Sequence, residues 1–133
     1  MKAADTSVVV AAFASWHERH ESANATLTSD VRLVDHCALE TYSVLTRLPA
    51  PHRAPAQVVR QFLRDRFPGT WLRLPAAAYR SFVLRLPEHE VVGGAAYDAL
   101  VAATAAHAGA QLISCDRKAA ALYERYGVAC LLV

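Results

Sequence analysis

The sequence predicts an α/β protein with a central, mainly parallel sheet of four to five strands and helices on both faces. Short segments rich in β-formers alternate with longer helical patterns along the 133 residues. Strands that are separated by helices pair in parallel through right-handed crossovers. The length fits one domain, and an apolar fraction of just over half supplies a core. We therefore expect a single domain spanning residues 1–133.

Strand and helix boundaries follow from β-branched content, helical spacing of apolar residues, prolines and glycines. Strands are expected at 2–5, 31–34, 111–114 and 128–133, with a fifth short one at 70–74. Helices are expected at 6–14, 17–27, 36–48, 55–67, 75–86, 95–108 and 117–126. Thr6 or Ser7 is placed to cap the first helix. The helix at 95–108 is apolar almost all round, so we expect it to lie deep in the domain.

Several classes of protein are disfavoured by composition. No apolar run approaches the roughly 20 residues of a membrane span, and Asp5 stands where a secretory apolar region would begin. The chain has three cysteines, an odd number, and no CxxC motif, which disfavours a disulfide framework or a zinc site. We expect a cytoplasmic protein that makes no contact with membranes.

Charge is unevenly distributed, although the formal net charge is only +2. Residues 47–87 hold eight arginines and one acid, a net of +7, whereas the remainder holds six bases and eleven acids, a net of −5. This pattern suits a protein that binds cations at one site and phosphates beside it. An arginine-rich helix surface that only faces solvent explains the pattern equally well. The candidates for binding the phosphates of a nucleic-acid backbone are Arg47, Arg53, Arg60, Arg64 and Arg73.

Four acids stand at strand ends and helix starts. Asp5 follows the first expected strand, and Asp116 follows the strand that ends at residue 114. Glu40 lies in the first turns of the helix after the second strand, and Asp98 lies in the first turn or so of the alanine-rich helix. Each acid taken alone could be a helix cap or a dipole partner. Ligands of parallel sheets bind at the carboxyl ends of the strands, so we expect Asp5, Glu40 and Asp116 to meet there, where Asp98 can join them from the N-terminus of its helix.

Converging carboxylates in apolar surroundings repel one another and are costly to bury. A divalent cation removes that cost, and ligands that are all oxygen favour Mg²⁺ or Mn²⁺. Such a site suits phosphodiester hydrolysis, because a bound metal activates water and neutralises charge on the leaving oxygen. We expect Asp5, Glu40, Asp98 and Asp116 to be both the metal ligands and the catalytic residues.

An ordered set of motifs resembles the PIN-domain family, and most closely its VapC-type toxins of bacterial toxin–antitoxin modules. The motifs are Asp5-Thr6-Ser7-Val8-Val9, Leu39-Glu40, Leu45-Thr46-Arg47, Tyr97-Asp98-Ala99-Leu100, Leu112-Ile113-Ser114-Cys115-Asp116 and Tyr123-x-x-x-Gly127-Val128. The resemblance implies a PIN-like α/β sandwich and an endoribonuclease whose acidic quartet binds Mg²⁺ or Mn²⁺. Ser7 and Ser114 match polar positions that support such a site.

The resemblance also implies partners. RNA is the implied substrate, homodimers are usual, and a cognate antitoxin is expected to fill an apolar groove among the early helices and to reach the acidic pocket with a basic side chain. Two alternatives remain within the family, a nuclease of RNA or DNA processing and a non-catalytic scaffold that binds a partner. A haloacid-dehalogenase-like phosphatase is disfavoured, because that chemistry uses Asp-x-Asp after the first strand and Ser7 stands at the second position.

Overall fold

The computed structural model describes residues 1–133 as a four-stranded, fully parallel sheet surrounded by helices. The strands are β1 (Lys2–Ala4), β2 (Arg32–Leu33), β3 (Gln111–Ser114) and β4 (Cys130–Leu132). Their order across the sheet is β2-β1-β3-β4. Ala4 pairs with both Leu33 and Ile113, so β1 and β3 form the centre of the sheet. The predicted fold class is confirmed, with four strands.

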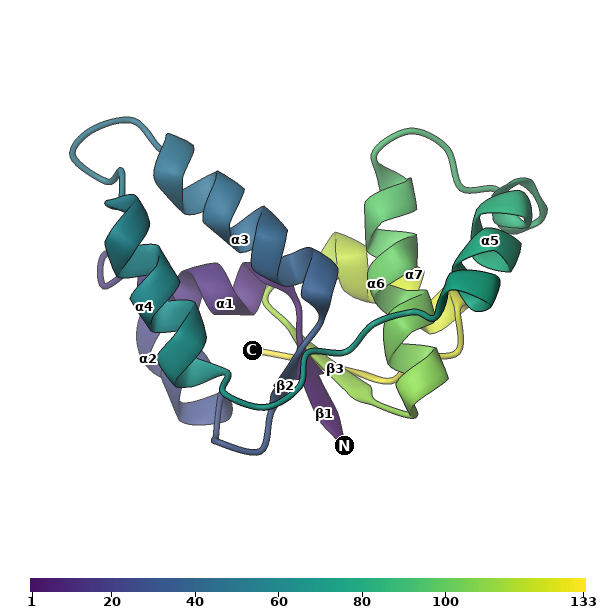
Figure 1. The fold of residues 1–133 in the computed structure, drawn as a ribbon, viewed down its shortest axis with the longest axis horizontal. Helices are drawn as coiled ribbons and strands as arrows, with labels where there is room; N and C mark the ends of the chain where they lie inside the picture. Colours follow the sequence, from purple (N-terminus) through teal and green to yellow (C-terminus); the bar gives the residue numbers. More distant parts are fainter.

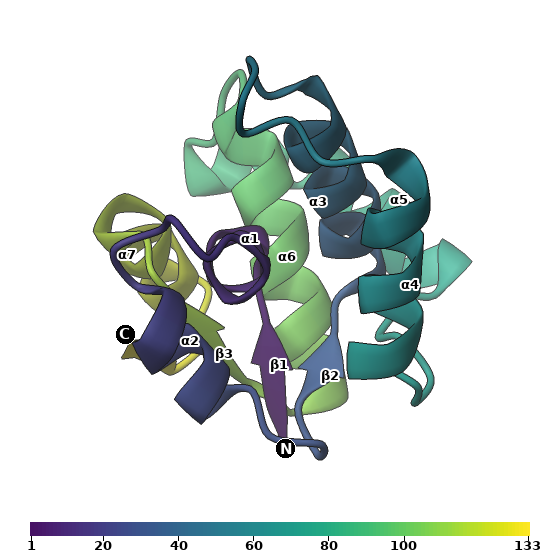
Figure 2. The same ribbon diagram turned by 90° about the vertical axis from the view of Figure 1, so that its left-hand side faces the viewer.

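Seven α-helices and one 3₁₀ turn connect and cover these strands. They are α1 (Thr6–Phe13), α2 (His20–Thr26), α3 (Asp35–Arg47), α4 (Ala56–Arg66), α5 (Ala76–Leu84), the 3₁₀ turn Leu86–His89, α6 (Ala95–Ala108) and α7 (Arg117–Arg125). In the view of Figure 1, α3 and α4 form one arm above the sheet and α5 and α6 form the other. Figure 2 looks along α1, which leaves the carboxyl end of β1.

Helix ends follow local capping chemistry. Asp5 caps α1, because its side chain accepts the amide of Val8, so the expected cap at Thr6 or Ser7 is wrong by one or two positions. Gly109 ends α6 in the left-handed conformation (φ 68°), which glycine adopts without a Cβ penalty. The predicted bounds of α6 and β3 are confirmed in full.

Several expected elements are shorter than their patterns indicated. The strands expected at 31–34 and 128–133 extend over Arg32–Leu33 and Cys130–Leu132 only. The strand expected at 70–74 is a single bridge, in which Leu72 donates to the Leu33 carbonyl and its own carbonyl accepts the Asp35 amide. The helix expected to begin at residue 17 begins at His20, because the preceding residues form two successive turns that are closed by the amides of His17 and His20.

Helix α6 is buried on one face only, which corrects the expectation that it lies deep in the domain. Ala99, Ala102 and Ala105 are fully buried, whereas Tyr97 and Ala106 are exposed. Its alanines are small enough to let α6 approach the sheet and α7 closely on one side. On its other sides, Leu100 and Thr104 line the groove between α3 and α6, and Ala106 lines a smaller hollow beside α5.

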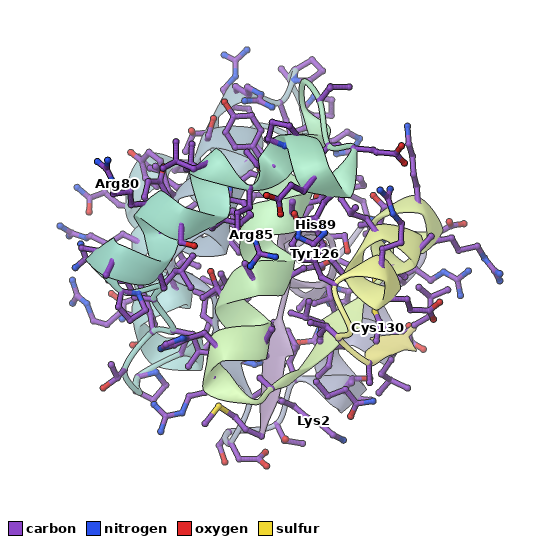
Figure 3. All side chains as sticks on the ribbon, turned by 90° about the vertical axis from the view of Figure 1, so that its right-hand side faces the viewer. Lys2, Arg80, Arg85, His89, Tyr126 and Cys130 are labelled. Atoms are coloured by element: carbon purple, nitrogen blue, oxygen red, sulfur yellow. The ribbon has the colours of Figure 1, made fainter.

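The main hydrophobic core is one cluster of 27 buried residues drawn from the sheet and from every α-helix except α5. A smaller cluster of Val91, Ala99 and Leu122 lies between α6 and α7, with Tyr126 packed against it. Tyr126 stacks on His89 on the face shown in Figure 3, with ring centroids 4.6 Å apart. No helix has the length and apolar character that crossing a membrane requires.

Candidate active site

The four predicted acids line one cavity of about 470 Å³. Asp5 and Asp116 directly follow β1 and β3, Glu40 lies on α3, and Asp98 lies in the first turn of α6. The winding of the sheet reverses between β1 and β3, because β2 lies on one side of β1 while β3 and β4 lie on the other. Ligands of such sheets bind at this switch point, beyond the carboxyl ends of the strands. The expectation that the acids meet there is confirmed.

Asp5 is the most enclosed acid of the cavity, with 3% of its surface exposed. Its Oδ1 accepts the Ser7 hydroxyl at 2.6 Å and the Val8 amide at 3.2 Å, and its Oδ2 accepts the Tyr123 hydroxyl at 2.9 Å. Burial raises the pKa of Asp5, and the hydrogen bonds from the hydroxyls oppose that rise. The carboxylate is therefore held in one orientation from three directions.

A chain of hydroxyls joins Asp5 to the end of β3. Ser7 has one proton and donates it to Asp5, so Ser114 must donate in its 3.1 Å contact with Ser7. Ser7 Oγ also accepts the amide of Cys115 at 2.8 Å, and Ser114 Oγ accepts the amide of Asp116 at 2.9 Å. The two serines thereby tie the loops that follow β1 and β3 to each other.

Asp116 is exposed and caps α7, with Oδ1 accepting the amides of Lys118 and Ala119 at 2.9 and 3.1 Å. Capping is therefore a real role for both Asp5 and Asp116, as the sequence allowed. For Asp116 it occupies one oxygen only, so Oδ2 makes no hydrogen bond within the chain. A cap and a cavity ligand are compatible roles for this side chain.

Glu40 on α3 and Asp98 on α6 line the cavity from the two arms. The Nε2 atom of His36, one turn before Glu40, lies 3.4 Å from Glu40 Oε2, and the His36 ring stacks on Tyr97 with centroids 5.5 Å apart. The pKa of Asp98 is raised, first by its partial burial and then by the negative charges of the other three acids. The other three acids are thus close enough for their charges to act on Asp98.

The chemistry of the cavity lining favours oxygen ligands. Burial raises the pKa of the Cys37 and Cys115 thiols, so these groups stay protonated and are poor metal ligands. Carboxylate oxygens fit Mg²⁺ or Mn²⁺, and the repulsion that raises the pKa of Asp98 is what a cation would relieve. As the side chains stand, no three carboxyl, imidazole or thiol groups lie close enough to hold one ion.

Among the cavity residues that were not predicted from the sequence are Tyr123, His17 and Arg19. Tyr123 was noted only as part of a terminal motif, yet burial and the Asp5 charge raise its pKa, so its phenol stays protonated and donates to Asp5. His17 and Arg19, on the turns between α1 and α2, also line the cavity. No spacing rule linked these turns to the acids, because the connection exists only in the folded chain.

The five arginines proposed to grip nucleic acid all lie outside the acid cavity, and all are exposed. Arg73 lines a groove between the two arms, and Arg60 and Arg64 line a neighbouring hollow beside Trp71. Arg47 donates to the Ser43 hydroxyl, and Arg53 donates to a backbone carbonyl. Contact of these residues with RNA stays a prediction.

Comparison with known proteins gives a consistent result. A family model described as "PIN domain" matches residues 3–125. Ribonuclease VapC40 of Mycobacterium tuberculosis is 51% identical over 133 residues, which cover all of this chain and 99% of that protein, in both strain CDC 1551 / Oshkosh and strain ATCC 25618 / H37Rv. Ribonuclease VapC27 of strain ATCC 25618 / H37Rv is 37% identical over 127 residues, 95% of this chain and 92% of that protein.

A solved structure has the same fold. FitAcB from Neisseria gonorrhoeae superposes with a TM-score of 0.70 at 21% sequence identity, covering 98% of this chain and 96% of that chain. At this identity the likeness concerns the fold alone.

Proposed function

This chain belongs to the PIN-domain family as a VapC-type member, and we propose that it is a single-domain, metal-dependent endoribonuclease of residues 1–133. It would act in the cytoplasm as the toxin of a type II toxin–antitoxin pair. The observation that carries this proposal is the convergence of four carboxylates from four elements on one cavity at the switch point of the sheet. Relatives that share 51% and 37% of its residues bear the name ribonuclease.

Asp5, Glu40, Asp98 and Asp116 would hold Mg²⁺ or Mn²⁺. When bound, the ion supplies concentrated positive charge for a phosphodiester and for the water that attacks it. The donor set fits such an ion, since carboxyl oxygens are the most numerous candidate ligands in the cavity, beside the His17 imidazole and two thiols whose pKa is raised by burial. The carboxylates would draw together around the cation, because binding relieves the mutual repulsion that raises the pKa of Asp98.

The chain's own contribution is to position these carboxylates. Tyr123 and Ser7 fix the two oxygens of Asp5, and Ser114 fixes Ser7, so the acid after β1 cannot rotate away. Asp116 is oriented by its capping bonds at the start of α7. Glu40 and Asp98 are less restrained and would close on a metal ion and substrate from opposite arms.

Two surfaces support the proposed protein partners. Phe13, Val58 and Phe62 line a hollow between α1 and α4, among the early helices, that suits an apolar segment of an antitoxin. The groove between the two arms exposes Leu39, Tyr42 and Trp71, and such apolar side chains suit a second copy of the chain. A homodimer would cover the face of α6 that is left exposed in the single chain.

The proposal is tested by incubating the purified chain with pooled cellular RNA in Mg²⁺, in Mn²⁺ and in EDTA. Asp5→Asn and Asp98→Asn remove cavity charges, and Asp65→Asn on α4 is the matched control outside the cavity. We expect metal-dependent cleavage by the wild type and by Asp65→Asn, with loss in both cavity variants. Equal cleavage by all forms would identify a contaminant. No cleavage of any RNA, with retained binding of a partner, would favour the non-catalytic scaffold.

A further inference from the structure

Arg19 is the single lysine or arginine among the residues that line the acid cavity. We propose that its guanidinium binds a phosphate of the RNA chain beside the acids, and so is a substrate-binding residue of the active site. This inference rests on the proposed function and extends it. It assigns a phosphate contact beside the catalytic acids to a residue that lies outside the basic segment 47–87.

The backbone of Arg19 is anchored on both sides. Its amide donates to His17 Nδ1 at 3.0 Å, and its carbonyl accepts both the Ala23 amide and the Ser22 hydroxyl. The His20 ring, which follows at once, lies 2.9 Å from the Ala11 carbonyl of α1. The turn is therefore fixed against α1, and its position over the cavity is set before any ligand arrives.

The guanidinium of Arg19, by contrast, has no partner in the chain. It forms no hydrogen bond and no salt bridge, although Glu18 and four further acids line the same cavity. Other arginines are engaged: Arg66 holds the carbonyls of Asn24 and Leu27, and Arg85 pairs with Glu88. The guanidinium of Arg19 is exposed and free to bind an anion that enters from solvent.

Charge balance explains why a cation is useful there. A phosphodiester that approaches four carboxylates is repelled wherever a metal ion does not neutralise them. Arg19 lines the same cavity as Cys115 and Asp116, the two residues that follow β3. Guanidinium matches phosphate through paired hydrogen bonds, whereas an ammonium acts as a point charge.

The test compares Arg19→Ala and Arg19→Lys with Arg80→Ala. Arg80 is an exposed arginine on α5, a helix that contributes nothing to the cavity, and it is labelled in Figure 3. Cleavage of the RNA that the wild type cuts is measured as kcat/KM. Binding of a labelled single-stranded oligonucleotide with that cleavage sequence is measured over a salt series, in an Asp98→Asn background that does not cleave.

We expect Arg19→Ala to lower kcat/KM by about 10- to 100-fold, as for loss of a charge-assisted contact, with Arg19→Lys in between and Arg80→Ala unchanged. The magnitude of the slope of log affinity against log salt concentration should fall by about 0.7 for Arg19→Ala alone, which is the change expected when one phosphate contact to a single strand is lost. Equal behaviour of Arg19→Ala and Arg80→Ala in both readouts, or faster cleavage by Arg19→Ala, would overturn the inference. A wild type that neither binds nor cuts RNA would instead overturn the proposed function.

Discussion

At the scale of single residues, Asp5 combines a capping role with a place in the cavity. It caps α1 and it is the buried acid of the cavity, with Ser7 and Tyr123 holding its two oxygens. A buried carboxylate that loses a hydrogen-bond donor keeps its desolvation cost. Tyr123 is therefore as important to the orientation of Asp5 as the strand that carries it.

Replacing Tyr123 with phenylalanine removes only the hydroxyl that Asp5 Oδ2 accepts. We expect a loss of about 1–3 kcal/mol in the free energy of unfolding, measured by urea denaturation, and slower RNA cleavage. The bond from Tyr123 lowers the pKa of Asp5, so its loss raises that pKa further and moves the acid limb of the cleavage profile to higher pH. Tyr126→Phe is the matched control, since the Tyr126 hydroxyl has no partner. Equal effects of the two variants would contradict this account of Tyr123.

The partial burial of Asp98, together with the negative charges of the other three acids, predicts a pH dependence of stability. The pKa of Asp98 in the folded chain is raised above its ordinary value of 3.8, so the folded state holds that proton more tightly than the unfolded state. The stabilisation that Asp98 contributes to the folded state is present below pH 3.8 and is lost as the pH rises through the raised pKa. In metal-free buffer we expect the free energy of unfolding of the wild type to fall more than that of Asp98→Asn between about pH 3.5 and pH 7, the range in which a raised carboxyl pKa lies. If the free energy of unfolding of the wild type and of Asp98→Asn depended on pH in the same way, this account of Asp98 would be contradicted.

At the scale of elements, the helices that begin at cavity acids depend on those acids for their first turn. Asparagine caps a helix about as well as aspartate, whereas alanine does not. This difference separates the structural role of Asp116 from its charge. It also shows why helix-start acids are ambiguous in a sequence, since the same oxygen atoms serve caps and metal sites.

For Asp116 at the start of α7, we expect the alanine variant to lose about 1 kcal/mol of stability and the asparagine variant to lose much less. Both should lose cleavage, because both remove the carboxylate from the cavity. Thermal unfolding and an RNA cleavage assay on the same preparations check the two expectations. Retained cleavage in Asp116→Asn would reduce Asp116 to a helix cap.

How much of the molecule could be predicted also differs between elements. The ends of α6 and β3 were predictable, because Gly109 and the turn around Gly93-Gly94 are local signals. The single bridge at Leu72 was not, because it depends on one partner residue across the sheet. The exposed face of α6 was also missed, since an apolar pattern does not tell whether the covering surface belongs to the same chain.

At the scale of the whole molecule, the parallel sheet brings together acids that lie up to 111 positions apart, from Asp5 to Asp116. This gathering was predictable, because β-α-β topology places the carboxyl ends of all strands at one edge. The contributions of Tyr123 and Arg19 were not, because they come from a helix face and a turn whose docking depends on tertiary packing. Sequence motifs thus located the charges, and the fold located the groups that orient them.

The exposed groove between the arms predicts assembly of the whole molecule. Leu39, 70% exposed on α3, lies beside Tyr42 and Trp71 on the groove surface. We expect Leu39→Glu to shift the chain from dimer to monomer in light scattering coupled to size-exclusion chromatography, since a charge is costly to bury at an apolar contact. Val92→Glu, an exposed position outside the groove, is the control. A dimer that withstands Leu39→Glu would place the interface elsewhere.

The central claim is that four carboxylates from four elements form one metal-dependent catalytic site. It is tested most directly by titrating Mn²⁺ into the chain, following free Mn²⁺ by electron paramagnetic resonance and RNA cleavage in the same samples. We predict that cleavage rises with bound Mn²⁺ in the wild type and in Asp65→Asn. Asp5→Asn, Glu40→Gln, Asp98→Asn and Asp116→Asn should each weaken Mn²⁺ binding and abolish cleavage. Unchanged Mn²⁺ binding in these four variants, or cleavage that persists without bound Mn²⁺, would contradict the claim.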